Sequence, residues 1–230
     1  AAFDEYENKK YHQAGEYTFP LDNDKLWDFK PLAKVGDKVA AGGWLGEVDE
    51  NFQPHKIMVP FTFKGEYTVK SLKEAGQYTI GEVIAVLTDE AGKDVEVTMI
   101  QRWPVKRAIT CYKEKPRPYK LLETGVRTID TVNPIVEGGT GFIPGPFGTG
   151  KTVLQHAISK QAEADIVIIA ACGERANEVV EIFTEFPELI DPHTGRKLME
   201  RTIIIANTSN MPVAAREASV YTAMSLAEYY

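Results

Sequence analysis

The sequence is poor in cysteine and in basic charge, and it has no long apolar run. Cys111 and Cys172 are too few for a disulfide framework or a cysteine-based metal site, so a reducing compartment is expected. The 33 Asp and Glu residues outnumber the 26 Lys and Arg residues, which argues against a nucleic-acid partner. No apolar run approaches the roughly 20 residues that cross a bilayer, and residues 1–7 lack a secretion leader. A soluble, unsecreted protein is expected.

The first half of the chain has the pattern of an all-β domain. Residues 17–103 consist of short apolar segments separated by glycine, which predicts a sandwich or small barrel. Residues 1–16 form an N-terminal segment to which we assign no fold. The expected strands are Lys34–Val39, Trp44–Val48, Lys56–Val59, Gly65–Val69, Glu82–Leu87 and Val95–Ile100.

A basic connector, residues 104–120, follows this domain, and its prolines favour an extended chain. A nucleic-acid patch is one interpretation of its cations. The acidic character of the whole chain favours the other interpretation, a solvated link that lies against acidic neighbours.

The second half, residues 121–230, alternates strands with helices. Its apolar strands lack polar alternation, as expected for a parallel sheet covered by helices on both faces. This pattern predicts an α/β fold built from right-handed crossover units. The expected strands are Thr140–Pro144, Asp165–Ala171 and Thr202–Ala206, and the expected helices are Lys151–Ala164, Asn177–Phe186 and Val213–Tyr230.

The strongest motif is a glycine-rich loop that matches G-x-x-x-x-G-K-[ST] before a predicted helix. Its glycines allow successive backbone N–H groups to face phosphate oxygens, and the N-terminus of the helix adds positive potential. Lys151 would reach the β- and γ-phosphates of ATP, and Thr152 would bind Mg²⁺. The alternative is a turn that only connects strand and helix. The predicted ATP/ADP-binding residues are Gly145, Pro146, Phe147, Gly148, Thr149, Gly150, Lys151, Thr152 and Val153.

A second candidate, Glu174-Arg175, directly follows a predicted buried strand. Ligands of open α/β sheets bind beyond the carboxyl ends of the strands, so Glu174 is expected beside the phosphate loop. A carboxylate there can orient the water that attacks a γ-phosphorus, and Arg175 can stabilise the developing charge. An exposed ion pair is the alternative. The segment Ala206–Ala218 is a third candidate, either a loop that touches nucleotide or a neighbouring subunit, or a plain strand-to-helix turn.

These residues resemble the catalytic A subunit of V-type and A-type rotary ATPases. The resemblance implies a P-loop NTPase domain of the RecA-like kind and a preceding region, called the bulge, with a barrel-sandwich fold. It further implies that Lys151 and Thr152 hold phosphate and Mg²⁺, that Glu174 positions the lytic water, and that Arg175 contacts the γ-phosphate. The matching segments are Ile143–Val153, Cys172–Arg175, Glu185–Leu189, Met199–Thr202 and Ala206–Ser219, with Trp103–Val105 at the domain junction.

The resemblance also implies partners. A non-catalytic B subunit would alternate with the catalytic one in an A3B3 hexamer and supply an arginine finger, with a central rotor, a peripheral stalk and, indirectly, a membrane sector completing the complex. ATP hydrolysis or synthesis would be coupled to proton or sodium transport, with the catalytic subunit peripheral on the cytoplasmic face of the membrane. The chain is expected to be a fragment, because the family's later magnesium aspartate, adenine pocket and helical domain are missing, and the isolated fragment is expected to be inactive.

Three positions depart from the family pattern. Ala171 and Ala176 replace glycines, which could tighten the loop near Glu174. Thr149 stands where eukaryotic A subunits have a redox-sensitive cysteine, which favours a bacterial origin.

Two other functions remain open from sequence alone. The first half also resembles a biotinyl or lipoyl carrier domain, in which Lys56 would be the modified lysine on a hairpin. Alternatively, the chain is an interaction module without chemistry of its own.

Overall fold

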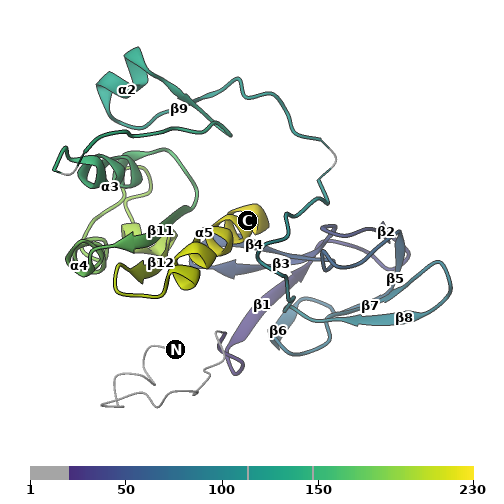
Figure 1. Ribbon diagram of the computed structural model, residues 1–230. Helices are drawn as coiled ribbons and strands as arrows, with labels where there is room; N and C mark the ends of the chain where they lie inside the picture. The colour runs from purple at the N-terminus through teal and green to yellow at the C-terminus, as the bar shows by residue number, and fades with distance from the viewer. Residues whose placement is uncertain (1–20, 113, 147) are drawn as a thin grey trace, which may run out of the picture. The chain divides into compact units, whose positions relative to one another are not determined.

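The computed structural model describes residues 21–112, 114–146 and 148–230 (Figure 1). The chain forms two compact units, which meet in sequence between Pro104 and Val105. The first unit contains only β-strands and the second contains all the described helices.

The first unit is built from two antiparallel four-stranded sheets, with strand orders β4-β3-β1-β6 and β2-β5-β7-β8. This agrees with the all-β prediction. Two strands, β1 and β6, were not predicted: β1 ends in a proline and β6 begins with a glycine, and both residue types commonly mark turns. The strands are β1 (Leu26–Pro31), β2 (Lys38–Val39), β3 (Trp44–Glu50), β4 (Gln53–Met58), β5 (Tyr67–Leu72), β6 (Gly76–Thr79), β7 (Ala85–Thr88) and β8 (Asp94–Val97).

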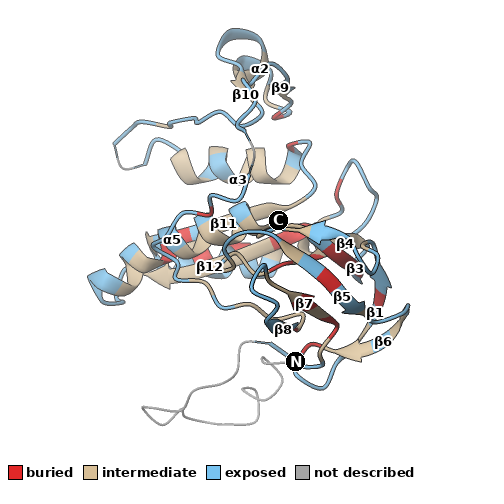
Figure 2. Cartoon of the chain, turned by 90° about the vertical axis from the view of Figure 1, so that its right-hand side faces the viewer, coloured by how far each residue is buried: buried red, intermediate tan, exposed pale blue. Residues whose placement is uncertain are grey.

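Buried apolar residues in and beside these strands form the core of the first unit, and buried residues are red in Figure 2. Gly46 lies directly against the buried ring of Phe29: a Cβ at this position would be 2.2 Å from Phe29 Cε2, so only glycine fits. Two buried clusters result, one of Leu45, Val59, Val69, Ala85, Leu87 and Val97, the other of Phe29, Val48, Ile57 and Ile84.

The β3–β4 hairpin argues against the carrier-domain alternative. Its tip is Asn51-Phe52, where both residues have positive φ (51° and 68°), the conformation of a tight hairpin turn. Lys56 instead lies within β4, opposite Glu47 of β3, with its Nζ 2.5 Å from the Glu47 carboxylate. A lysine held in a cross-strand ion pair is not presented at the tip of a hairpin for modification.

In the second unit, two parallel strands carry the predicted α/β pattern. β11 (Val167–Glu174) pairs with β12 (Thr202–Thr208), and α5 (Val213–Tyr229) packs against both. The predicted helices and these two strands are confirmed to within a few residues. The remaining elements are β9 (Leu121–Leu122), α2 (Arg127–Val132), β10 (Ile135–Val136), α3 (Lys151–Gln161), α4 (Ala176–Glu185) and the 3-10 helix η1 (Leu198–Arg201).

Two expectations for this unit are wrong. Residues 140–144 form no strand, because an extended segment becomes a strand only when a neighbour pairs with it, and Phe142 there is largely exposed. β11 and β12 are mostly half-buried rather than buried on both faces, since the described sheet around them has two strands only. Within the described ranges, no helix has the length and hydropathy needed to span a bilayer.

Candidate active site

The glycine-rich loop leads into an uncapped helix. Gly148 and Gly150 have φ of 79° and 82°, left-handed conformations that other residues adopt at a cost. Gly150 is the N-cap of α3 and makes no side-chain capping bond, while the first N–H groups of any helix lack an intrahelical partner. The loop therefore presents backbone donors and the positive end of an 11-residue helix at one point.

The Lys151 ammonium folds back across this loop. Its Nζ donates to the carbonyl oxygens of Gly145 and Pro146 at 2.5 and 2.9 Å. Thr149 also donates to the Pro146 carbonyl, at 2.8 Å. A cation that already bonds oxygen acceptors inside the loop is placed to exchange them for phosphate oxygens. Val153 is exposed on the first turn of α3, and Phe147 lies outside the described residues.

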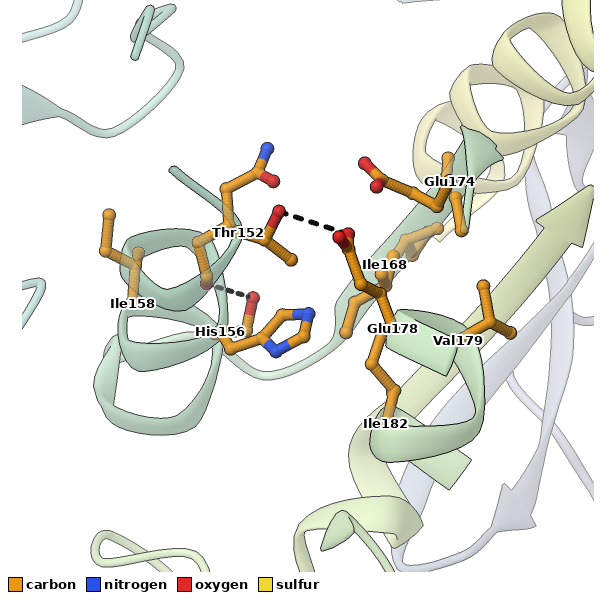
Figure 3. A pocket seen from close by; sticks show the side chains of 13 residues that line it. Thr152, His156, Ile158, Ile168, Glu174, Glu178, Val179 and Ile182 are labelled. Atoms are coloured by element: carbon orange, nitrogen blue, oxygen red, sulfur yellow. Dashed lines mark hydrogen bonds between the residues drawn. The ribbon is translucent and has the colours of Figure 1, made fainter. Parts of the chain in front are cut away.

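Two carboxylates and a hydroxyl face one another beside the loop (Figure 3). Glu174 comes from the end of β11, Glu178 from the first turn of α4, and Thr152 from the first turn of α3. The Thr152 hydroxyl donates to Glu178 Oε2 at 3.3 Å. All three line a cavity of about 260 Å³ between α3, β11 and α4.

The pairing of the two carboxyl groups changes the proton affinity of Glu174. A hydrogen bond with the Glu178 side chain raises the pKa of Glu174, and burial and the charge of Glu178 add to this effect. The Lys151 ammonium acts in the opposite direction. The pKa of Glu174 thus depends on both the second carboxylate and the lysine of the glycine-rich loop.

The structure brings Lys151, Thr152 and Glu174 together, and it adds Glu178, which the sequence analysis missed. The available signal was an acidic residue in the first turn of the predicted helix after Glu174. Arg175 is the N-cap of α4, and its side chain is exposed.

The turn that carries Glu174 rests on α5. Gly173 has φ of 89°, and a Cβ there would lie 3.2 Å from Nη1 of Arg216, so the arginine side chain covers this glycine. The Glu174 carbonyl accepts a hydrogen bond from the Ser209 N–H at 2.9 Å. The predicted third candidate segment, residues 206–218, therefore contacts the Glu174 turn directly.

The opposite end of α3 is closed by a buried ion pair. Arg201 donates to the carbonyl of Ala164 at 2.5 Å and lies 3.1 Å from Asp191 Oδ1. The His193 ring nitrogen contacts the Gln161 carbonyl at 3.0 Å. These groups satisfy carbonyls at and just beyond the last turn of α3, where a cation also complements the helix dipole.

Comparison with known proteins matches both halves of the chain. Residues 18–106 match the model of the ATP synthase alpha/beta subunit barrel-sandwich domain, and residues 125–230 match the nucleotide-binding domain of the ATP synthase alpha/beta family. The all-β first unit and the α/β second unit agree with these two descriptions.

Curated relatives share more than half of the aligned residues. V-type ATP synthase alpha chains of Treponema denticola and Borrelia garinii subsp. bavariensis are 58% and 56% identical over 218 residues, or 95% of this chain. The V-type ATP synthase alpha chain 1 of Treponema pallidum is 53% identical over the same length. The chain spans only 37–38% of the length of these relatives. With both domain models matched in order and such identity along almost all of its length, the chain belongs to the ATP synthase alpha/beta family.

Proposed function

We propose that this chain is the phosphate-binding part of a catalytic subunit of a V-type or A-type rotary ATPase, within a RecA-like P-loop domain. The observation that carries the proposal is the convergence at one place of the Gly145–Val153 loop, the Lys151 ammonium and the Glu174 carboxylate. Hydrogen-bond donors that hold the phosphates and a carboxylate that orients water are two of the parts that P-loop ATPases use for hydrolysis.

In this proposal the protein side chains act mainly by position and charge. Backbone N–H groups at the start of α3 bind phosphate oxygens, and Lys151 leaves the loop carbonyls to contact the β- and γ-phosphates. Glu174 orients the attacking water, and Arg175 stabilises charge on the transferring group.

The residues present also fit Mg²⁺. This ion prefers hard oxygen ligands, and a hydroxyl and a carboxylate, those of Thr152 and Glu178, already meet at 3.3 Å. Thr152 would hold the ion and Glu178 would lie next to it. The bound ion supplies positive charge to the phosphate oxygens.

The wider context of this site is part of the same proposal. A non-catalytic B subunit would complete the site at an interface within an A3B3 hexamer, and rotor and stalk subunits would couple it to a membrane sector that moves protons or sodium ions. The catalytic subunit would be peripheral on the cytoplasmic face. For the isolated chain we expect weak or absent nucleotide binding and no activity.

Glu174→Gln in the full-length subunit, assembled in its complex, tests the proposal. The amide keeps the shape of the side chain but cannot polarise water, so kcat for ATP hydrolysis should fall by roughly 100-fold or more. Nucleotide affinity, measured by displacement of a fluorescent ADP analogue, should change little.

Glu181→Gln on the exposed face of α4 is the matched control, and it should turn over normally. Normal turnover by Glu174→Gln would remove Glu174 from the mechanism. Loss of nucleotide binding in that variant would show that the carboxylate holds the site together rather than acting on water.

A further inference from the structure

One buried hydroxyl connects α5 to the sheet at the edge where Glu174 emerges. Ser219 of α5 is 2% exposed, and its hydroxyl donates to the Ala215 carbonyl of its own helix at 2.9 Å. The same oxygen accepts a hydrogen bond from the Asn207 side-chain amide of β12. The Ser219 side chain thereby links α5 to the end of β12, the strand that pairs with β11.

This link lies at the last regular pair of the sheet. Cys172 stands opposite Asn207, and the register then shifts, so that Glu174 stands opposite Thr208. Gly173 is the extra residue at this irregularity, in a left-handed conformation under the Arg216 side chain. A bulge of this kind redirects the residue that follows it, which here is Glu174.

Packing alone does not require these polar groups. An apolar residue at position 219 would fill the same space between helix and sheet, and a buried hydroxyl is costly unless its hydrogen bonds are made. Thr222, one turn further along α5, shows the contrast: its hydroxyl bonds the Ala218 carbonyl of the same helix at 2.9 Å and joins no strand in the contacts described.

We propose that Ser219 and Asn207 are positioning residues that fix the Cys172–Glu174 bulge on α5 and so hold the Glu174 carboxylate in place for catalysis. This inference rests on the proposed ATPase function. Neither side chain touches nucleotide in the proposal: Ser219 is buried, and both act through the pairing of β12 with β11.

The test compares Ser219→Ala and Asn207→Ala with Thr222→Val in the full-length subunit, assembled in its complex. A displacement of about 1 Å at a reacting group can cost about 100-fold in rate. Loss of one hydrogen bond behind Glu174 should displace its carboxylate by less than this, so each of the two positioning variants should lower kcat about tenfold. KM for ATP and the affinity for a fluorescent ADP analogue should stay within about twofold of wild type, because phosphate binding is made by α3 and its loop. Thr222→Val should retain full kcat.

The split between kcat and affinity separates positioning from general support of the fold, which would weaken binding as well. Asn207 is half-buried, so its variant remains testable if Ser219→Ala does not assemble. Unchanged kcat in Asn207→Ala, or a parallel loss of affinity and kcat, overturns the inference. Lys151→Ala, measured alongside, distinguishes failure of this inference from failure of the proposed function. If Lys151→Ala remains active, the proposed ATPase site is wrong. If Lys151→Ala is inactive and Asn207→Ala is fully active, only the positioning role is wrong.

Discussion

Lys151→Ala in the assembled complex should lower ATP turnover by about 1,000-fold, the largest loss we expect from any single side chain here. The ammonium is the one side-chain cation that the described structure places on the phosphate loop, with its Nζ 2.5 Å from the Gly145 carbonyl. A charge directed at the transferring phosphate in a site that excludes water contributes several kcal/mol to transition-state stabilisation. Steady-state hydrolysis with a coupled ADP assay measures the effect.

Lys160→Ala is the matched control for this variant. Lys160 lies on the same helix, and its Nζ is 2.7 Å from a carboxylate oxygen of Glu185 at the end of α4. Removing this partly exposed ion pair should leave turnover close to wild type, as is usual for pairs of this kind. Retained ATPase activity in Lys151→Ala would contradict the assignment of the phosphate loop.

Asp191→Ala should destabilise the second unit by about 3–5 kcal/mol, because it leaves the buried Arg201 guanidinium without its counter-charge. Asp191 and Arg201 are 1% and 7% exposed, and their atoms lie 3.1 Å apart. The same guanidinium bonds the Ala164 carbonyl just beyond the end of α3. Loss of the Asp191 carboxylate should therefore also weaken the anchoring of the C-terminal end of α3.

Urea unfolding of the chain, followed by circular dichroism at 222 nm, measures this change. All described helices belong to the second unit, so the helical signal reports on that unit. Lys120→Ala, which removes the exposed Lys120–Glu137 pair, is the control and should scarcely move the transition. An Asp191→Ala transition at the wild-type midpoint would show that the ion pair makes no net contribution.

The same carboxylate predicts how stability depends on pH. Burial raises the pKa of Asp191, but hydrogen bonds from Thr194 and His193 and the Arg201 guanidinium outweigh it and hold the pKa below its usual range. A lowered folded-state pKa contributes stability that is complete above the ordinary aspartate pKa and is lost as the pH falls through the folded value. Part of the acid sensitivity of the helical transition should therefore be missing in Asp191→Asn.

Part of the site was readable from sequence because local rules determine it. The geometry of the glycine-rich loop follows from fixed glycine positions before a helix, and the position of Glu174 follows from its place directly after an apolar strand. The same reasoning failed for residues 140–144, because an apolar segment shows what can be buried, whereas a strand also needs a partner.

Other parts of the site depend on three-dimensional neighbours. The meeting of Thr152 with Glu178 depends on how α4 starts relative to α3, and 26 residues separate the two side chains in sequence. The link between Asn207 and Ser219 depends on the register of β12 and the rotation of α5. No motif encodes such angles, so the structure was needed to find these residues.

The most direct test of the account is the position of the nucleotide in a structure of the full-length subunit, determined in its complex with Mg²⁺ and ADP. We expect the phosphates on the backbone N–H groups of residues 148–152, with Lys151 Nζ released from the Gly145 and Pro146 carbonyls and bonded to a phosphate oxygen. Nucleotide bound elsewhere on the chain, with Lys151 still bonded to both carbonyls, would contradict it.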